Sequence, residues 1–262
     1  MAYLKFGILP LVIILFSSTT AFAYEPIPIT ISSTMDKLVL DGKWTHPIEW
    51  KQSSLNEFVY DDQTKIILRT AHQGDFVYVF IDAISDFTLD KNADRAIICF
   101  DSKNNKSIKP DADDYCFISV LEGTNHSLQG GSPIAINGHF EKIHDHKNTV
   151  VLSSISDRND RYSKTPHPSF EFKIPIDIIQ RNSVYGFYYQ VFDANKNMVY
   201  EYPKNMYHIS TIKISSPSEW GEVYSPDKSI PEFNLPILIM ILSIGLITFF
   251  SKTKYLNNVL RN

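Results

Sequence analysis

Residues 75–82 read Asp-Phe-Val-Tyr-Val-Phe-Ile-Asp, an unbroken apolar run with an acidic residue at either end. Both faces of such a run are apolar, which is typical of a central β-strand covered on both sides. Residues 169–175, Ser-Phe-Glu-Phe-Lys-Ile-Pro, instead alternate polar and apolar residues, which predicts a strand with one buried and one solvated face. Pro175 has no N–H to donate, so the pairing ends there. These two stretches predict a sheet protein.

The rest of the middle of the chain has the same character. Short runs rich in β-branched and aromatic residues are separated by Asn, Asp, Gly or Pro, and no sustained helical period occurs. Only Ile176–Arg181 is expected to form a helical turn. We predict an all-β protein, a single antiparallel β-sandwich over residues 24–224. The other expected strands are Ile27–Ser32, Lys37–Leu40, Lys65–Ala71, Ala96–Phe100, Tyr115–Leu121, Val150–Ser154, Tyr185–Phe192 and His208–Ile214.

The N-terminal residues 1–23 have the layout of a secretory signal peptide. Lys5 precedes the short apolar run Phe6–Phe16, and Ala21 and Ala23 supply the small residues before a cleavage point ahead of Tyr24. A retained transmembrane helix is the alternative, but the apolar run is too short to span a bilayer.

A second apolar segment lies near the C-terminus. Residues 235–251 contain no charged side chain, and Lys252 and Lys254 follow them. We predict a transmembrane helix at 235–251, a juxtamembrane stalk at 225–234 and a tail at 252–262. The positive-inside rule places the tail in the cytoplasm and the sandwich outside. A buried core helix is the alternative, but it would need polar positions along one side.

The tripeptide Pro231-Glu232-Phe233, ahead of this segment, resembles archaeal surface-protein sorting signals of the PEF type. The resemblance implies enzymatic processing and attachment to lipid, as an alternative to a helix that stays in the membrane. Either outcome leaves the domain at the cell surface.

Charge argues against a nucleic-acid partner. The whole chain has a formal net charge of −4, and without the two apolar ends residues 24–230 contain 21 basic and 28 acidic residues, a net charge of −7. Neutralising phosphates requires a basic face. We therefore expect an acidic, outward-facing module that binds no nucleic acid.

Six pieces of the sequence, in order, resemble carbohydrate-binding module family 9-like domains, which are related to DOMON domains. The pieces are Leu38–Trp44 with Trp50, Phe76–Asp82, Asp94–Asp101, Asp114–Phe117, Phe170–Pro175 and Trp220–Glu222. The resemblance extends from about residue 37 to residue 223. It implies an extracellular β-sandwich whose relatives bind sugars, while some related domains bind haem.

The two cysteines, Cys99 and Cys116, belong to a chain that is expected to be exported, where disulfides persist. Residues 102–113 are suited to a hairpin loop. A register that pairs Asp101 with Asp114 also places the two cysteines opposite each other. We predict a disulfide, and two buried free thiols are the alternative.

A sugar site needs exposed aromatic rings together with polar side chains. Tyr188 and Gln190 share one face of their expected strand, opposite Phe187 and Tyr189, and further aromatic residues follow. Core or edge packing is the alternative role for each ring. The candidate ligand surface comprises Tyr188, Gln190, Tyr200, Tyr202 and Trp220.

An acidic group in the same hairpin loop is a candidate Ca²⁺ site, because Ca²⁺ prefers several hard oxygen ligands. Its members are Asp101, Asp111, Asp113 and Asp114. The alternative is a solvated loop in which Lys103, Lys106 and Lys109 act as counterions.

Haem, the other ligand that the resemblance implies, would need axial His, Met or Lys ligands. Met198, Met206 and His208 lie near one another in the sequence, but no motif marks them as ligands. Asn105 and Asn125 begin N-glycosylation sequons, which an exported protein makes available.

No nucleophile elbow, HExxH motif, P-loop or dinucleotide fingerprint occurs in the sequence. We therefore expect a non-enzymatic, membrane-anchored extracellular module that binds a carbohydrate or another component of the cell envelope. The alternatives are a haem-binding redox subunit and a structural envelope protein without a small ligand.

Overall fold

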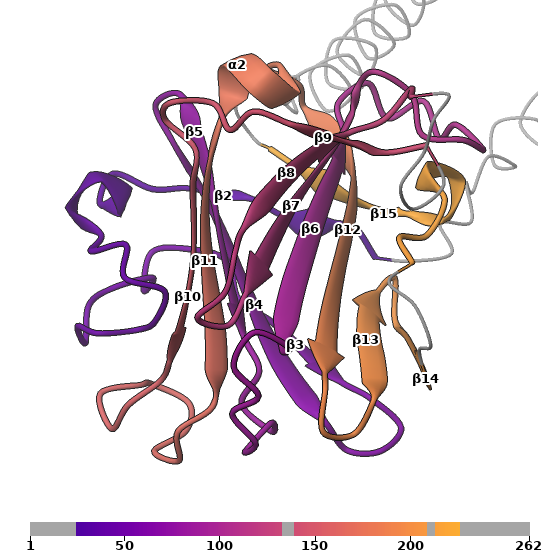
Figure 1. Cartoon of the computed structure of the whole chain (residues 1–262). Helices are drawn as coiled ribbons and strands as arrows, with labels where there is room; N and C mark the ends of the chain where they lie inside the picture. The colour runs from indigo at the N-terminus through magenta and orange to yellow at the C-terminus, as the bar shows by residue number, and fades with distance from the viewer. Residues whose placement is uncertain (1–24, 133–138, 209–212, 226–262) are drawn as a thin grey trace, which may run out of the picture.

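The computed structural model describes residues 25–132, 139–208 and 213–225 (Figure 1). The predicted signal segment, anchor and tail lie outside these residues, as does the predicted stalk except for Ser225. Within the described part of the chain, no helix is both long and apolar enough to cross a membrane.

Two sheets face each other as a sandwich, and the described chain is almost entirely β (Figure 1). The six-stranded sheet has the order β10-β11-β5-β4-β2, with β3 also on β4. Its strands are β2 (Thr30–Ile31), β3 (Asn56–Val59), β4 (Lys65–Gln73), β5 (Phe76–Asp82), β10 (Val150–Ile155) and β11 (Pro168–Pro175). The central position predicted for residues 76–81 is confirmed, because β5 lies between β4 and β11.

The nine-stranded sheet has the order β1-β15-β12-β6-β7-β8-β9, and β13 and β14 continue from the same edge of β12 as β15. Its strands are β1 (Ile27–Pro28), β6 (Arg95–Asp101), β7 (Asp114–Val120), β8 (His126–Gln129), β9 (Glu141–Ile143), β12 (Val184–Asp193), β13 (Met198–Tyr202), β14 (Asn205–His208) and β15 (Gly221–Tyr224). The helical segments that the structure describes are short: η2 (Met35–Lys37), α2 (Ile176–Ile179) and η3 (Pro217–Glu219). The helix α2 confirms the turn predicted after Pro175.

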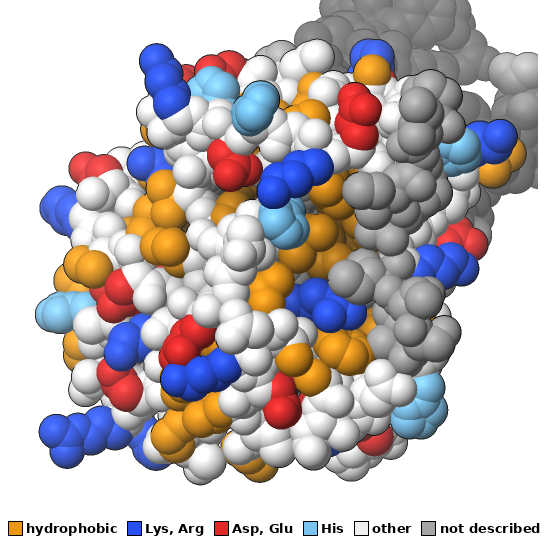
Figure 2. Space-filling view, viewed as in Figure 1, with side chains coloured by type: hydrophobic (Ala, Val, Ile, Leu, Met, Phe, Trp, Pro, Cys, Tyr) orange, Lys and Arg blue, Asp and Glu red, His pale blue; other side chains and the backbone are white. Residues whose placement is uncertain are grey.

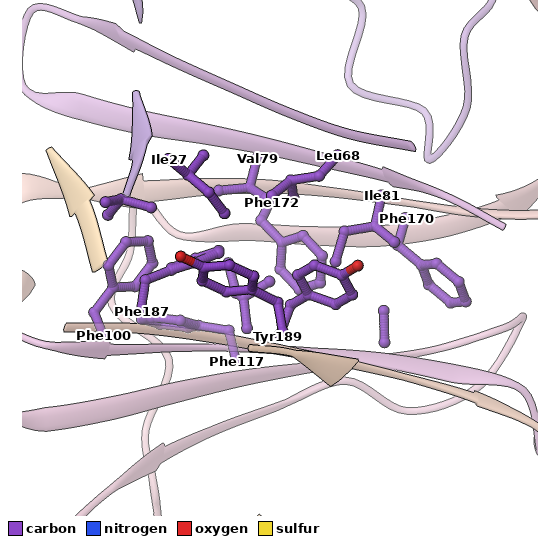
Figure 3. Close-up of a cluster of buried hydrophobic side chains, with 14 of the residues drawn as sticks. Ile27, Leu68, Val79, Ile81, Phe100, Phe117, Phe170, Phe172, Phe187 and Tyr189 are labelled. Atoms are coloured by element: carbon purple, nitrogen blue, oxygen red, sulfur yellow. The ribbon is translucent and has the colours of Figure 1, made fainter. Parts of the chain in front are cut away.

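The main core fills the space between the two sheets (Figure 3). Alternate residues of β12 point into it, so Phe187 and Tyr189 are fully buried there, while Tyr188 points to the opposite face of the sheet. Phe170 and Phe172 of β11 enter the same core from the six-stranded sheet. Burying side chains of this size is the main favourable contribution to folding.

The sheets are mixed and not purely antiparallel as expected. The strand β1 pairs in parallel with β15, and β2 pairs in parallel with β4. The segment from Ile27 to Ile31 passes from one sheet to the other, and no hairpin joins it to either partner. Its direction is therefore not constrained by the antiparallel rule that short turns impose.

Strand predictions were most accurate for the long apolar runs. The expected strand at Lys37–Leu40 is wrong, because Met35–Lys37 form a 3₁₀ turn and the following residues have no regular structure. The expected strand at His208–Ile214 falls mostly on residues outside the described chain, and its first residue ends β14. The short strands β3, β8, β9, β13, β14 and β15 were not anticipated.

The polar face of β11 is not solvated as its alternation predicted. Ser169 and Glu171 are both fully buried, because the segment around Asp41–Trp50 covers them. A third cluster of large side chains, including Trp44, Trp50 and Phe80, fills this outer layer. The centre of the six-stranded sheet, at β4, β5 and β11, is therefore covered on both faces.

Cys99 and Cys116 form a disulfide across β6 and β7, with a Cα–Cα distance of 4.1 Å. The register of the two strands pairs Asp101 with Asp114 and the two cysteines with each other. The bond lies on the outer face of the nine-stranded sheet, in an apolar cluster with Ile97 and Tyr188.

Candidate functional site

The outer face of the nine-stranded sheet contains a pocket of about 610 Å³ beside β13 and β14. Volumes of this order are common for sites that bind small ligands. Apolar side chains gather in the middle of the face shown in Figure 2, and Tyr188 belongs both to the apolar cluster on the outer face and to the pocket lining. The pocket is lined by Tyr188, Glu201, Pro203, Lys204, Asn205, Tyr207, Lys213, Ser215 and Glu219.

Strand register brings the polar residues of this pocket together. Gln190 of β12 pairs with Glu201 of β13, and Glu201 pairs with Asn205 of β14. Directly paired residues project on the same face of a sheet. Three consecutive strands therefore place a row of polar side chains on the outer face, and Tyr188 and Tyr207 lie beside this row.

Glu201 is the hub of a hydrogen-bond network. The Tyr188 hydroxyl donates to Glu201 Oε2 at 2.6 Å, and the Tyr207 hydroxyl donates to the same oxygen at 3.3 Å. Asn205 Nδ2 donates to Oε1 at 3.1 Å. Gln190 Nε2 supports the network by donating to the Tyr188 hydroxyl at 2.9 Å. Interlocked partners of this kind hold side chains in fixed positions.

The two tyrosine hydroxyls are firmly protonated. Burial, together with the nearby Glu201 carboxylate, raises the pKa of Tyr207 to about 12. Burial also raises the pKa of Tyr188 well above its usual value, again with a contribution from Glu201. Both hydroxyls therefore remain hydrogen-bond donors throughout the physiological range of pH.

The structure separates the predicted ligand residues into two groups. Tyr188 and Gln190 do reach the outer face, and Tyr188 lines the pocket. Tyr200 and Tyr202 point into the core between the sheets, so neither ring can stack on a ligand. Trp220 is 3% exposed, and its ring stacks between Tyr188 and Phe140. These three rings are packing residues.

Sequence reasoning missed Glu201 and Asn205. The signal was present in β13, where Met-Val-Tyr-Glu-Tyr places Glu201 opposite the face of Tyr200 and Tyr202. Which face of β13 points into the core depends on the position of this strand in the sheet. That position is set by partners that the sequence does not reveal.

A second pocket, of about 500 Å³, lies beside η2, under residues that cover the six-stranded sheet. Its lining includes Met35, Val39, Ile48 and Trp50, of which Val39 and Ile48 are exposed. Its buried carboxylate, Glu49, accepts the backbone N–H groups of Thr45 and His46, whereas Glu201 is held by side-chain donors from its two neighbouring strands. We regard the pocket at Glu201 as the candidate ligand site.

The aspartates of the candidate Ca²⁺ group bind groups of their own loop. The carboxylate of Asp101 accepts the backbone N–H groups of Asn105 and Lys106, and that of Asp114 accepts the N–H of Asp111. Lys103 Nζ lies 2.9 Å from Asp113 Oδ1. These aspartates thus brace their own hairpin loop, with a lysine as counterion. Among the described residues, they do not form a group of three converging ligands.

Two other groups of His, Asp or Glu do converge in the described chain. One consists of Asp82, Asp160 and His167. The other consists of Asp86, Asp94 and Asp193. Lys196 Nζ lies 3.2 Å from Asp193 Oδ2. Each of the three carboxylates also accepts at least one backbone N–H group. This second group is an acidic cluster that a lysine partly neutralises.

The second group predicts an unusual dependence of stability on pH. Burial raises the pKa of Asp86 to about 7 and that of Asp94 to about 6, and neighbouring carboxylates add to both shifts. The unfolded chain releases these protons near pH 4. Between about pH 4 and 7 the folded state binds more protons, so the free energy of unfolding falls as pH rises, by up to about 1.4 kcal/mol per pH unit for each proton.

Urea unfolding at pH 5 and pH 8 should therefore show that the stability gained by an Asp86→Asn variant, relative to the unmodified protein, is larger at pH 8 than at pH 5. Asparagine keeps the Oδ1 acceptor for Thr88 and removes the titration. Asp61→Asn, at an exposed carboxylate, serves as the control. An Asp86→Asn variant with an unchanged pH slope would contradict the assignment.

The haem candidates do not converge on an open site. Met198 and Met206 pack in or against the main core, while His208 is exposed and its Nδ1 lies 3.2 Å from the carbonyl oxygen of Asn197. Of the two sequons, Asn105 is exposed. The side chain of Asn125 is half-buried, and its Nδ2 donates to the carbonyl oxygen of Val151 at 2.6 Å. Asn105 is thus the more accessible glycosylation position.

No family model and no curated protein matches the chain. Among solved structures, the chain is similar to a carbohydrate binding module family 9 from Caldicellulosiruptor kristjanssonii in complex with cellotriose, with 15% identity, 80% of this chain and 100% of that chain covered, and a TM-score of 0.49. The same module in complex with glucose has 14% identity, the same coverage and a TM-score of 0.44. A putative carbohydrate-binding protein from Bacteroides uniformis has 10% identity, 77% and 99% coverage, and a TM-score of 0.44.

Proposed function

We propose that this protein is an extracellular, membrane-anchored module that binds a carbohydrate in the pocket at Glu201. The observation that carries the proposal is the hydrogen-bond hub, in which one carboxylate is held by two tyrosine hydroxyls and an amide at the lining of an open pocket. Export and anchoring rest on the sequence of residues 1–23 and 235–251.

The chemistry of this pocket suits a polyhydroxylated ligand. Sugar hydroxyl groups both donate and accept hydrogen bonds, and the lining offers Glu201 as acceptor, Lys213 as donor, and Asn205 and Ser215 as both. Hydrogen bonds to a charged group are the stronger kind, about 1.5–3 kcal/mol each. The half-buried ring of Tyr207 adds an apolar surface that a sugar ring can contact.

The network also favours binding over catalysis. The carboxylate of Glu201 is occupied by three donors that orient it, and no nucleophile shares its hydrogen bonds. A prearranged set of donors and acceptors loses little conformational entropy when a ligand arrives. We propose a polysaccharide or another glycan of the cell envelope or the surroundings as the partner.

Binding of the purified full chain to a glycan array, followed by titration calorimetry on the hits, tests the proposal. We expect at least one glycan to bind, and we expect Glu201→Gln and Asn205→Ala each to weaken its Kd about tenfold or more, which corresponds to about 1.4 kcal/mol. Asn205 is exposed, so its replacement should leave the fold intact.

Ile48→Ser, at an exposed residue of the other pocket, is the matched control and should bind as the unmodified protein does. Thermal unfolding of each variant separates lost binding from lost structure. The proposal fails if no glycan binds, or if Asn205→Ala and Glu201→Gln leave the affinity unchanged while Ile48→Ser reduces it.

A further inference from the structure

Three buried side chains meet at the end of β5, away from the pocket at Glu201. Asp82 is the last residue of β5, His167 immediately precedes β11, and Asp160 lies in the connection between β10 and β11. Each side chain is 0% exposed. One ligand atom from each lies within 4.8 Å of the other two.

The imidazole of His167 is oriented by its own surroundings. Its Nδ1 lies 2.7 Å from the carbonyl oxygen of Thr165, which can only accept, so Nδ1 bears a proton and donates. The Nε2 atom then faces the two aspartates, at 2.7 Å from Asp82 Oδ1. A histidine that ligates a metal is typically held in this way, with its second nitrogen donating to a carbonyl or carboxylate.

The carboxylate of Asp160 is oriented in the same manner. Its Oδ1 accepts the backbone N–H groups of Tyr162 at 2.7 Å and Ser163 at 2.9 Å. Its Oδ2 is buried and has no hydrogen-bond partner, and the same is true of Asp82 Oδ2. Lys164 donates to the backbone carbonyl of Asp160 and not to its carboxylate.

The charges of this group do not balance. Two buried carboxylates face at most one imidazolium, and each carboxylate has one oxygen without a donor. Leaving a buried charged atom unpaired costs several kcal/mol, so a group of this kind requires a further positive charge. A cation between the three side chains would supply it.

We propose that Asp82, Asp160 and His167 bind a divalent transition-metal ion, with Zn²⁺ as the best fit. An imidazole nitrogen with two carboxylate oxygens is a donor set that Zn²⁺ accepts, whereas Ca²⁺ prefers a larger shell made of oxygens alone. Because all three ligands are completely buried, the ion would be shielded from bulk solvent. It joins β5 to the connection between β10 and β11.

The ion would also order the neighbouring aromatic layer. Tyr162, whose backbone N–H donates to Asp160, packs its ring against Trp44 with the ring centres 5.8 Å apart. The hydroxyl of Tyr162 accepts a hydrogen bond from Arg69 Nε at 2.7 Å. Holding Asp160 therefore fixes a contact that reaches the outer cover of the six-stranded sheet.

The test uses the purified full chain, stripped with a chelator and then titrated with Zn²⁺, Mn²⁺ or Ca²⁺ alone. We expect tight uptake of Zn²⁺ and a rise in Tm of about 5–10 °C at a hundredfold excess over its Kd. Asp160→Asn keeps the Oδ1 acceptor for Tyr162 and Ser163 but supplies a neutral ligand, so Zn²⁺ affinity should fall at least tenfold. His167→Gln should have a similar effect. Replacing Zn²⁺ with Co²⁺ gives a visible spectrum that should change in the His167→Gln variant.

Asp157→Asn is the matched control, because Asp157 lies in the same connection but pairs with Lys43. It should take up Zn²⁺ as the unmodified chain does. Unchanged Zn²⁺ affinity in Asp160→Asn and His167→Gln would overturn the site. So would the absence of Zn²⁺ uptake and of any Tm rise, which would assign the missing positive charge to a proton shared by the two aspartates. Preference for Ca²⁺ over Zn²⁺ would overturn the choice of metal class.

Discussion

Replacing Glu171 with alanine is expected to lower the free energy of unfolding by about 3–5 kcal/mol, because three buried N–H donors lose their acceptor at about 1–3 kcal/mol each. Glu171 projects from β11 on the outer face of the six-stranded sheet and is 0% exposed. Its Oε2 accepts the backbone N–H groups of Asp41 at 2.9 Å and Gly42 at 2.8 Å, and its Oε1 accepts the indole N–H of Trp50 at 2.9 Å. Alanine leaves all three donors without a partner.

A Glu171→Gln variant separates the charge from the hydrogen bonds. Burial raises the pKa of Glu171 to about 8, while its three N–H donors act in the opposite direction. Glutamine keeps the shape and the burial but turns one acceptor into a donor, which then faces an N–H group. We expect its stability to fall between those of the unmodified protein and the alanine variant.

Urea unfolding monitored by tryptophan fluorescence measures both variants, since Trp44 and Trp50 lie in the layer that Glu171 holds. Glu57→Ala is the control, because Glu57 is an exposed partner of Lys65 and its loss should cost less than about 1 kcal/mol. A Glu171→Ala variant as stable as Glu57→Ala would show that the three donors find other partners.

The sequence pieces that resemble family 9-like modules thus include the residues of a buried hydrogen-bond network. The pieces around Asp41-Gly42, Trp50 and Glu171 are far apart in the chain, and they meet at this one carboxylate. The piece around Asp82 ends at the buried group with His167. The residues of this pattern stabilise the sandwich and do not line the pocket at Glu201. The pattern therefore predicted the sandwich but not the ligand surface.

The sequence predicted the elements whose signal is local. The runs at β5, β6, β7 and β12 are long and apolar, so their period is visible without knowledge of the partners. The two-residue strands β1 and β2 have no such period, and their parallel pairing depends on segments far along the chain. The cysteine register was accessible because a single hairpin joins β6 and β7.

The candidate sites were harder to predict because their residues converge through tertiary structure. Alternation correctly separated Tyr188 from Tyr189, but it could not say which face of β13 is buried, so Tyr200 and Tyr202 were placed on the wrong side. Glu201 became visible only once β13 was aligned between β12 and β14. His167 and Asp82 are 85 residues apart in the sequence, with β6 to β10 between them, and no motif spacing links them.

Replacing Gly42 with alanine is the second change for which we expect a large loss, about 3–5 kcal/mol of unfolding free energy. Gly42 has a φ of +86°, where an L-residue is strained by about 1–2 kcal/mol. A Cβ at this position would lie 2.4 Å from the backbone carbon of Ser153 and 2.7 Å from its oxygen. These atoms belong to β10 and cannot move without disturbing its pairing with β11, so overpacking adds to the strain.

Gly74→Ala is the matched comparison because it isolates the backbone strain. Gly74 also has a positive φ, +59°, but nothing lies within 4 Å of a Cβ built there. Its replacement should cost only about 1–2 kcal/mol. Thermal and urea unfolding of the two variants under the same conditions give the difference directly, and equal losses would contradict the close approach of Gly42 to β10. We expect Gly42→Ala to lose more unfolding free energy than Gly74→Ala. We also expect the double variant Gly42→Ala/Glu171→Ala to lose little more than either single variant, because the Gly42 N–H donates to Glu171 and residues that share a contact do not contribute additively.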